Sequence, residues 1–474
     1  MGDENFFSRK IPRGVGWLYT LGSLSLFLLS LQLITGILLA MNFSASPEQA
    51  HASIQYIMEQ VPMGRLIRGL HKWGASLMVI FVTLHMIRVY FMGAYKYPRE
   101  RTWVLGVFLW IVVLMFGFTG YLLPWDQKAY WATTVGTHLA AQVPWIGPSI
   151  AKVLQGGKTL GAVTLTRFYA FHILVLPLFL FSLTGIHLFF VIQQGISAPP
   201  DREKIPQDSH WKERVKNRYL ELKSQGQSFF PYTIYKDILA VFAVFLLAFA
   251  LALWSPAGLE EVADPTDSNY NPRPEWYFLF LFQALKFFPG SLEALAAVLL
   301  PSLALGLLVL LPFLDKGPQR HWWDRPWVTG LGVTALAGVI ALSVMGWRSP
   351  RVNPVVKEDP QVVSGRALYS ELRCYYCHSI RGKGGVTAPD LSTVGARRDR
   401  VWLLKHFEDP AALSPGTVMP KLHLLPEEMS RLAAYLETLG GGGPYSPKAP
   451  GLFQKNCSSC HALDSRGESL GPDL

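Results

Sequence analysis

Seven long apolar segments constrain this chain of 474 residues more than any other feature of its sequence. Each is long enough, or nearly so, to cross a bilayer as a helix, which takes about 20 residues. Half of all residues are hydrophobic and only 16% are charged, which is typical of membrane proteins. The sequence therefore predicts an all-α membrane bundle. The predicted spans are residues 17–41, 74–92, 103–123, 169–192, 238–254, 294–314 and 327–347.

The distribution of basic residues predicts the orientation of these spans. Lys and Arg are more frequent in the N-terminal arm and in every second loop than in the loops between them. The side richer in Lys and Arg is normally cytoplasmic. We therefore expect a cytoplasmic N-terminus in a bacterial inner membrane, with everything after residue 347 on the outer, periplasmic side. These loops account for the net charge of +10, so nucleic-acid binding is not expected.

The cysteines point to covalently bound haem. All four stand in two copies of Cys-x-x-Cys-His. In this motif the thiols add to the haem vinyl groups and the His ligates the iron, whereas a redox dithiol or half a zinc site would not need the adjacent His. The first iron still requires a sixth ligand, for which we predict Met419, with Met429, His406 and His423 as alternatives. The motif residues are Cys374, Cys377 and His378, and Cys457, Cys460 and His461.

The two motifs lie in similar surroundings and predict a repeated domain. Residues 351–443 have a soluble composition, and the first motif with short helices expected before Cys374 and around residues 427–439 predicts a small α-helical cytochrome c domain with one haem. Residues 444–474 repeat its beginning in register as far as Asp-Leu. The second copy has no counterpart of Met419 and no closing helix. We expect that the sequence is cut short and that the natural protein carries a second complete cytochrome c domain. The alternative is a true end, with an open haem completed by a partner subunit.

Four histidines lie in or beside two of the predicted spans, and such residues are functional candidates in a membrane. A single one would more often hydrogen-bond to a neighbouring helix. Here His71 and His85 are 14 residues apart, and His172 and His187 are 15 apart. Such intervals place both histidines of a helix on one face, roughly 21 Å apart. We predict that His71 pairs with His172 near the outer face, that His85 pairs with His187 near the inner face, and that each pair binds a b-type haem.

Glycines on the two remaining helices repeat the histidine interval. Gly22 and Gly36 are 14 residues apart, and so are Gly106 and Gly120. Glycine in membrane helices often serves only close helix packing, but the shared interval predicts room for the porphyrin edges. Basic side chains near the histidines are candidates to pair with haem propionates, although an interfacial role is the alternative for the second of them. They are Arg68, Arg88 and Arg167.

At this point the sequence resembles the cytochrome b subunit of the cytochrome bc complexes, over residues 10–347. The resemblance rests on LIRGLHKWGASL, GFTGYLLPWDQKAYWATTV, TLTRFYAFHILVLPL, FFPYTIYKDIL and NPRPEWYFLFLFQALK. The 15-residue histidine interval and the seven helices are similar to the chloroplast-type branch, whose two halves are separate chains and are fused here. Thr20 and Gln193 stand where that branch has the Cys and Arg of an additional haem, so only two membrane haems are expected.

The resemblance implies a four-helix dihaem domain in residues 1–200 and a three-helix quinol-site domain in residues 201–350. It implies a quinol–cytochrome c reductase that oxidises quinol at the outer face, with Glu275 as proton acceptor and Tyr277 and Tyr121 as weaker catalytic candidates. Electrons would pass through the two b haems to an inner quinone site, and through the c-type haem on the high-potential branch, coupled to proton translocation.

The resemblance also implies partners. The high-potential acceptor in this family is a Rieske iron–sulfur protein, and no cysteine of this chain is free to hold its cluster, so that protein would be a separate subunit. A soluble or membrane cytochrome would accept the electrons, and the complex would be homodimeric. Two other readings stay open: a transmembrane electron conduit without quinol chemistry, and the dihaem anchor of a dehydrogenase or hydrogenase.

Overall fold

The computed structural model describes residues 8–157, 160–265, 270, 273–288, 292–349, 359–380 and 382–439. The chain divides into two compact units, one of residues 1–263 and 269–353 and the other of residues 264–268 and 354–474. The predicted domains 1–200 and 201–350 therefore lie in one unit. The second haem motif, Cys457, Cys460 and His461, and the predicted domain 444–474 lie outside the described residues.

The all-α fold class and the seven predicted spans are confirmed: seven helices of the described residues are long and apolar enough to cross a membrane. Several begin earlier than hydropathy indicates, because polar residues continue the helix beyond its apolar part. The helix around His71 begins at Gly64, for example, so this histidine lies well inside it. The helices of the first unit's spans are α1 (Leu21–Ala40), α3 (Gly64–Phe91), α4 (Glu100–Tyr121), α7 (Ala162–Ala170) continued by η3 (Phe171–Val175) and α8 (Leu176–Gln194), α10 (Ile234–Trp254), α12 (Leu300–Leu314) and α13 (Pro326–Arg348).

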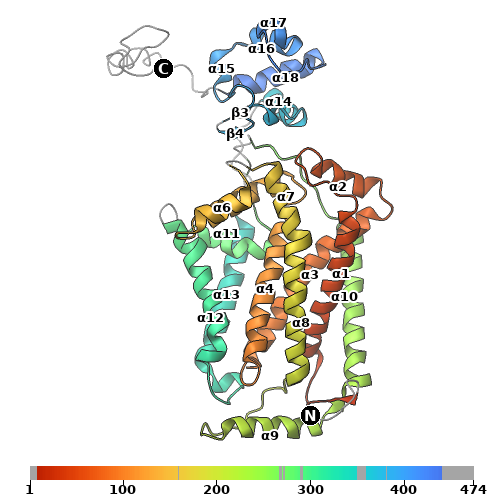
Figure 1. Ribbon diagram of the computed structural model, residues 1–474, viewed down its shortest axis with the longest axis vertical. Helices are drawn as coiled ribbons and strands as arrows, with labels where there is room; N and C mark the ends of the chain where they lie inside the picture. Colours follow the sequence, from red (N-terminus) through yellow and green to blue (C-terminus); the bar gives the residue numbers. More distant parts are fainter. Residues whose placement is uncertain are drawn as a thin grey trace, which may run out of the picture. The chain divides into compact units, whose positions relative to one another are not determined.

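The spans form a four-helix group with three further helices beside it (Figure 1). Helix α1 packs on α3, α4 packs on α8, and α3 also contacts α4. Helix α10 packs against α3 and α1, and α12 packs against α4. The buried centre of this group consists of Leu, Val, Met and Ala side chains, including Leu28, Leu77 and Val113. Shape complementarity of these apolar side chains and close backbone approach hold such helices together in lipid.

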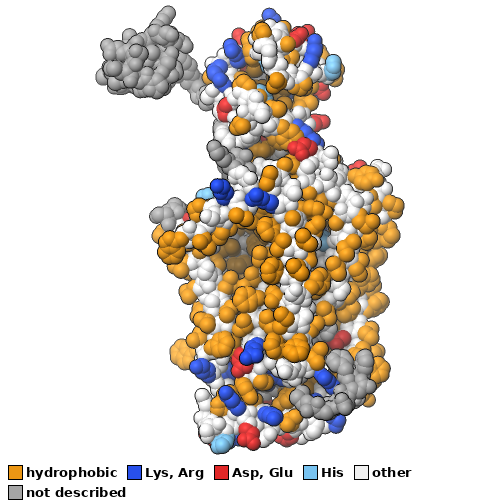
Figure 2. Space-filling view, viewed as in Figure 1, with side chains coloured by type: hydrophobic (Ala, Val, Ile, Leu, Met, Phe, Trp, Pro, Cys, Tyr) orange, Lys and Arg blue, Asp and Glu red, His pale blue; other side chains and the backbone are white. Residues whose placement is uncertain are grey.

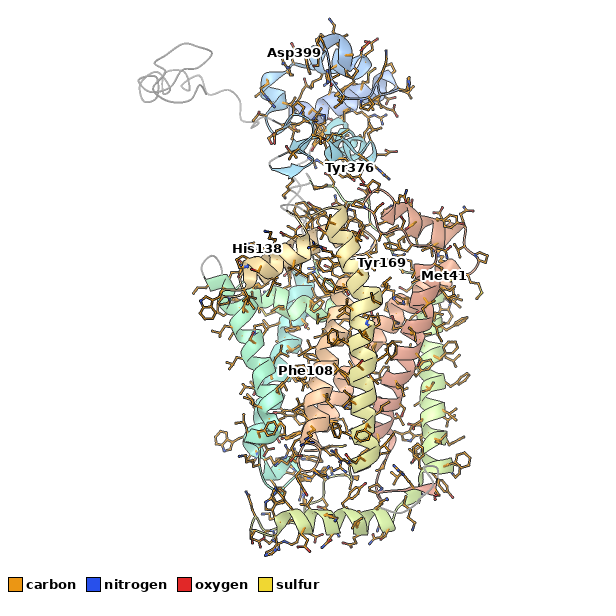
Figure 3. All side chains as sticks on the ribbon, viewed as in Figure 1. Met41, Phe108, His138, Tyr169, Tyr376 and Asp399 are labelled. Atoms are coloured by element: carbon orange, nitrogen blue, oxygen red, sulfur yellow. The ribbon has the colours of Figure 1, made fainter. Side chains whose placement is uncertain are left out.

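The outward-facing side chains of the spans are apolar, as a lipid environment requires. Figure 2 shows hydrophobic side chains covering the bundle between its ends. Phe108, half-way along the bundle in Figure 3, is 45% exposed. We therefore describe the chain as a multi-pass membrane protein, in which this exposed apolar surface faces lipid.

Shorter elements gather at the two ends of the first unit (Figure 1). One end carries the amphipathic helices α2 (Ala50–Glu59), α5 (Gln127–Ala141) and α6 (Gly147–Gln155). The other carries α9 (Trp211–Ser224) and the N-terminal strand β1 (Lys10–Ile11), which pairs antiparallel with β2 (Gln227–Ser228). A short apolar helix, α11 (Leu279–Leu285), follows η5 (Trp276–Phe278) and packs on α13. These end elements position the residues between the spans.

A buried ionic cluster joins α12 and α13 to the loop between α3 and α4. Asp315 binds Lys96 at 2.8 Å and Arg325 at 3.1 Å, and Tyr95 donates a hydrogen bond to the same carboxylate. Arg325 in turn donates to the carbonyls of Tyr90 and Phe91. Burial lowers the pKa of Lys96, and the Asp315 carboxylate opposes that shift. One carboxylate therefore neutralises two buried cations.

Asp315→Asn should destabilise the membrane unit strongly, because it leaves the ammonium of Lys96 and the guanidinium of Arg325 buried without a counter-charge. Removing one partner of a buried ion pair costs about 3–5 kcal/mol. Thermal unfolding of the detergent-solubilised protein measures the effect. Asp208→Asn, which breaks an exposed ion pair with Arg214, should leave the melting temperature unchanged. An Asp315 variant as stable as the wild type would contradict this account.

The second unit is a small helical domain around its own core. It contains α14 (Pro360–Glu371), η9 (Cys374–Tyr376), β3 (Ser379–Ile380) paired with β4 (Lys383–Gly384), α15 (Val394–Arg397), α16 (Arg400–Glu408), α17 (Pro410–Leu413) and α18 (Pro426–Glu437). Helix α14 crosses α18 at Gly365, where an added Cβ would lie 1.9 Å from the carbonyl oxygen of Arg431. Only glycine permits this crossing, which closes the core around Tyr369 and Leu432.

Candidate functional site

The structure brings His71 of α3 and His172 of η3 together. Their ring centroids are 6.4 Å apart, and the rings are inclined by 72°. Gly36 and Gly120 face the same pair: an added Cβ would lie 3.2 Å from Cε1 of His71 and 2.6 Å from Cε1 of His172, respectively. The two rings therefore lie between two helices that carry glycine at the points of closest approach.

Two threonines orient these rings. The Oγ1 of Thr35 lies 2.9 Å from Nδ1 of His71, and the Oγ1 of Thr119 lies 2.9 Å from Nδ1 of His172. Each hydroxyl donates its only hydrogen to a helix carbonyl, that of Leu31 or Met115. It must therefore accept from the histidine, which assigns the proton to Nδ1 and leaves the lone pair of Nε2 free for a metal.

His85 of α3 and His187 of α8 form the second pair, on the same two spans as the first. Among the described residues, no threonine hydroxyl binds the Nδ1 atoms of this pair. An added Cβ on Gly22 would lie 3.4 Å from Cε1 of His85, and one on Gly106 would lie 3.6 Å from Cε1 of His187. Among the described residues, the buried Nδ1 atoms of both rings have no hydrogen-bond partner. The backbone of Thr102 lies close to the His187 ring, but its geometry does not allow a hydrogen bond to Nδ1.

The residues of both pairs fit a haem. Two imidazoles on facing helices supply the two axial nitrogens that a six-coordinate haem iron takes, and all four glycines leave open the space that a side chain would fill. The pair predicted to lie near the outer face, called the outer pair, is His71 and His172 with Gly36 and Gly120, and the pair predicted near the inner face, called the inner pair, is His85 and His187 with Gly22 and Gly106. The expected pairing of the histidines agrees with this arrangement and stays a prediction for the haems themselves.

Two of the three arginines predicted to bind propionates, Arg68 and Arg167, contact the protein main chain, and the third, Arg88, lies 4.2 Å from the ring centroid of Tyr19. Arg68 donates to the carbonyls of Ala257 at 2.7 Å and Gly258 at 2.8 Å. Arg167 donates to the carbonyls of Lys152 and Val153 in α6. Both guanidinium groups therefore connect a span to an end segment, and a propionate role for either stays a prediction. Thr20, which stands where a cysteine would be needed to attach an additional membrane haem, donates to the carbonyl of Trp17 at 2.8 Å.

In the second unit, Cys374 and His378 flank the short turn η9. The Nδ1 of His378 lies 2.8 Å from the carbonyl oxygen of Pro389, which can only accept, so Nε2 is free to ligate iron. Burial raises the pKa of Cys374 to about 11. Both cysteines are free thiols, Cys377 being exposed. This donor set suits covalent haem attachment.

The candidates for the sixth ligand of this iron differ in their surroundings. Met419 and Met429 both pack against the core of the second unit. His406 stacks on Trp402 at 4.6 Å, and its buried Nδ1 has no partner within the described residues. His423 is exposed. Met419 stays the predicted ligand, and His406 is the strongest alternative that the structure offers.

The three catalytic candidates converge at the end of the membrane unit that carries α5. Glu275 precedes η5, and both Tyr121 and Tyr277 lie within electrostatic range of it. Tyr277 packs on α4, where an added Cβ on Gly117 would lie 2.8 Å from its hydroxyl oxygen. The carboxylate of Glu275 forms an ion pair of 2.5 Å with Lys128 of α5. Lys128 was not among the sequence candidates.

Comparison with known families decides the identity of both units. The family model described as Cytochrome b/b6/petB matches residues 6–195, and that described as Cytochrome b (C-terminal)/b6/petD matches residues 262–359. The model described as Cytochrome c matches residues 362–440. This chain belongs to the cytochrome b family. It carries a cytochrome c domain in the same polypeptide, so the resemblance and the fusion predicted from the sequence are confirmed.

A solved structure titled "Hyperthermophilic respiratory Complex III" is similar to this cytochrome b, with a TM-score of 0.62 and 29% sequence identity. The similarity covers 72% of this chain and 86% of that chain. Cytochrome b and cytochrome c domains imply b-type and c-type haems, respectively.

The sequence analysis did not identify the residues that contact the predicted histidine ligands and Glu275. Thr35 and Thr119 each precede a predicted glycine by one residue, which is the signal that could have found them. Lys128 and Asp237 carried no signal of their own, because a lysine beside a membrane end and an acid at a helix start are common. Asp237, on α10, contacts Ser23 of α1, the neighbour of Gly22.

Replacing either threonine by valine should raise the midpoint potential of the outer haem of this cytochrome b. The histidine Nδ1–H then loses its acceptor, the imidazole donates less charge to the iron, and the reduced state gains stability. We expect about a tenfold change in the reduction equilibrium, or about 59 mV for one electron. Redox titration of both b haems measures it. Thr83→Val, which removes a hydroxyl whose one hydrogen-bond partner among the described residues is Trp110, should shift neither haem, and an unshifted outer haem in Thr119→Val would contradict the assignment.

Proposed function

We propose that this cytochrome b–c chain is the membrane subunit of a quinol–cytochrome c oxidoreductase. The observation that carries the proposal is the arrangement of two histidine pairs along one four-helix group, with Glu275 beside the outer pair. Tyr277, two residues from Glu275, packs on α4 at Gly117, one turn before Gly120 and His172. The similar chain titled as a respiratory Complex III supports the same type of enzyme.

The residues at the α5 end of the bundle suit quinol oxidation. When bound, the haems supply one-electron carriers between the two faces. Glu275 offers a carboxylate oxygen to accept a proton from a quinol hydroxyl, because it stands at the edge of an apolar region formed by Tyr121 and Tyr277. The proton then leaves on the outer side.

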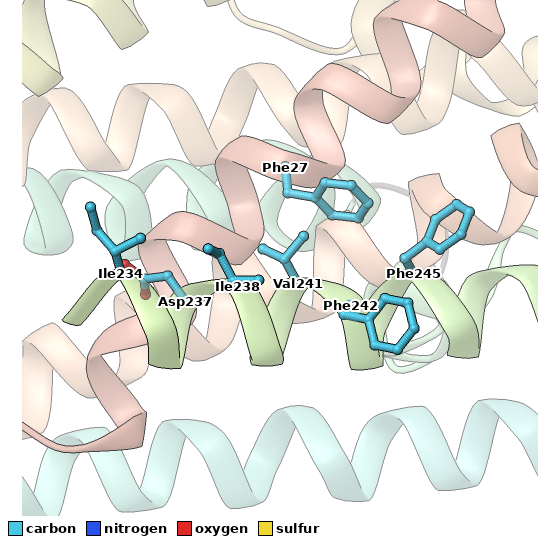
Figure 4. Close-up of a pocket in the computed structure, with 7 residues that line it drawn as sticks. All are labelled: Phe27, Ile234, Asp237, Ile238, Val241, Phe242 and Phe245. Atoms are coloured by element: carbon cyan, nitrogen blue, oxygen red, sulfur yellow. The ribbon is translucent and has the colours of Figure 1, made fainter. Parts of the chain in front are cut away.

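A groove at the opposite end suits the inner quinone. It holds about 520 Å³ and is lined by apolar side chains of α1 and α10 with a single carboxylate, Asp237 (Figure 4). This volume is typical of ligand pockets, which combine apolar walls with a few polar groups. Asp237 contacts Ser23, which follows Gly22 at the inner histidine pair. The groove is therefore next to the inner haem position, where a quinone would receive electrons and protons.

The partners and the location follow from this function. A Rieske iron–sulfur protein accepts the second electron of quinol, and the fused cytochrome c domain passes it to a further cytochrome. The complex is homodimeric and lies in a bacterial inner membrane, with the N-terminus in the cytoplasm and the cytochrome c domain in the periplasm. Quinol-dependent cytochrome c reduction by the purified complex separates this function from an electron conduit or a dehydrogenase anchor.

Glu275→Gln should slow quinol oxidation while both b haems stay bound. The amide keeps the shape of the side chain but cannot accept the proton in the transition state, and loss of such a group typically costs about 100-fold or more in rate. Rapid-mixing measurements of b-haem reduction by quinol give the rate, and optical spectra give the haem content. Glu293→Gln, at another acid near α12, serves as the control. Wild-type reduction in Glu275→Gln would remove Glu275 from the mechanism.

A further inference from the structure

Two fixed backbone segments hold the ion pair between Lys128 and Glu275. Helix α5 begins at Gln127 and is capped by Asp126, whose side chain accepts from the backbone N–H of Ala129 at 2.9 Å. The other carboxylate oxygen of Asp126 accepts from the N–H of Glu260 at 3.2 Å. Because Lys128 lies in the first turn of this anchored helix, the reach of its side chain is set by the fold.

The segment before Glu275 is anchored as firmly. Arg273 donates to the carbonyl oxygens of Gly346 at 2.9 Å and Ser349 at 2.7 Å, at the end of α13. Glu275 itself begins the turn that leads into α11, where its carbonyl accepts from the N–H of Phe278. The 2.5 Å contact between Nζ of Lys128 and Oε1 of Glu275 therefore joins two segments that are each held by other hydrogen bonds. It is partly shielded from water, because only 29% of the Lys128 side chain and 22% of the Glu275 side chain are exposed.

The surroundings of the pair contain few other charges. Nζ of Lys128 lies 5.7 Å from the ring centroid of Tyr121, whose buried hydroxyl has no partner among the described residues. Lys72 of α3 interacts with Glu275 and Lys128 at longer range. The groups that interact with the pair are Lys72 on α3, Tyr121 on α4 and Tyr277 on the segment of Glu275. Asp126 at the start of α5 and Glu260 in the loop after α10 interact with Tyr121, and Arg273 precedes Glu275 by two residues.

We propose that Lys128 is a positioning residue for quinol oxidation: its ammonium holds Oε1 of Glu275 and directs Oε2 toward the quinol hydroxyl. This inference rests on the proposed function. Oxidation of one quinol releases two protons and two electrons: Oε2 of Glu275 takes one proton, water on the outer side takes the other, and the electrons would go one each to the outer haem, when bound, and to the high-potential iron–sulfur acceptor. A neutral carboxyl no longer attracts the ammonium as an ion, so protonation releases Glu275 from Lys128 and frees it to deliver the proton outward.

The proposal predicts the direction of a pH effect. A cation next to a carboxylate favours its ionised form. In Lys128→Met, the acid limb of the quinol-oxidation rate should therefore move to higher pH by about one unit, which is about a fivefold lower rate at the pH of the wild-type half-maximum.

The experiment uses the intact complex and measures b-haem reduction by a short-chain benzoquinol and a short-chain naphthoquinol between pH 5 and pH 9, as about nine points. Lys128→Arg should restore the wild-type profile, since a guanidinium also pairs with the carboxylate. Lys152→Met removes an exposed charge from α6 and should not shift the limb. If Lys128→Met loses its haems, Lys128→Gln takes its place.

The outcomes separate this inference from the function on which it rests. A shifted limb in Lys128→Met that Lys128→Arg reverses supports the positioning role. An unshifted limb in Lys128→Met, together with slow oxidation in Glu275→Gln, overturns the role of Lys128 and leaves Glu275 as proton acceptor. Wild-type rates in Glu275→Gln overturn the proposed function of that residue. A uniform rate loss at every pH in Lys128→Met would show a structural role only and would also overturn the proposal.

Discussion

His71→Ala and His172→Ala should each remove the same b haem, and His85→Ala and His187→Ala should each remove the other. The rings of His71 and His172 face each other at 6.4 Å, so the loss of either leaves one axial position of the iron without a ligand. The variant that lacks both His71 and His172 should lose no more haem than either single variant, because residues that act as one unit are not additive. Low-temperature optical spectra and redox titration of the purified complex identify the missing component.

A matched control comes from a histidine outside the bundle. His138 lies on α5 and is exposed, and its only ionic contact in the described residues is a 3.9 Å approach to Glu293. His138→Ala should keep both b haems with unchanged spectra. Loss of different haems in His71→Ala and His172→Ala would disprove the pairing, and so would the loss of both haems in every one of the four variants if the apoprotein stays folded.

Gly120→Ala should remove the outer haem as well, with the fold intact. The added Cβ would lie 2.6 Å from Cε1 of His172, a distance that requires one of the two to move. The ring cannot move easily, because Thr119 holds its Nδ1 and Phe116 packs against it at 5.3 Å. A displaced imidazole cannot meet the iron along its axis. Haem content per polypeptide, from pyridine haemochrome spectra, gives the loss.

Gly106→Ala is the control for this substitution at the other pair. Its Cβ would lie 3.6 Å from Cε1 of His187, which is ordinary van der Waals contact. The inner haem should therefore survive in Gly106→Ala to a greater extent than the outer haem survives in Gly120→Ala. Gly36→Ala, at 3.2 Å from His71, should fall between them. Equal losses in all three variants would show that the space for the porphyrin, rather than the ring contact, selects glycine.

Much of this chain could be predicted from one-dimensional patterns. The seven spans follow from apolar length, because a bilayer imposes the same requirement on every helix that crosses it. The covalent haem site follows from Cys374, Cys377 and His378, which are neighbours in the sequence and need no fold to bring them together. The histidine and glycine intervals are similarly local, since a helix converts a spacing of 14 residues into one face.

Contacts between distant segments could not be predicted in this way. The helix starts were predicted late, since hydropathy detects the lipid-facing part of a helix and not its polar continuation. The propionate role predicted for Arg68 and Arg167 stays a prediction, but the carbonyls that their guanidinium groups bind, that of Ala257 and that of Val153 in α6, could not be predicted, because an arginine takes whichever acceptor the fold brings within reach. The ionic cluster at Asp315 joins residues more than 200 positions apart in the sequence, and nothing local announces it.

The sequence by itself determined the seven membrane spans and the cytochrome family of each unit, and it predicted which histidines would ligate haem, because all of these depend on composition or on spacing within one helix. Only the tertiary structure decided which polar groups support them. Thr35 and Thr119 meet their histidines across a helix interface, and Lys128 reaches Glu275 from a segment 147 residues away. A hydrogen bond or an ion pair forms only within a few ångströms, and which distant side chains come that close depends on how the helices and loops pack.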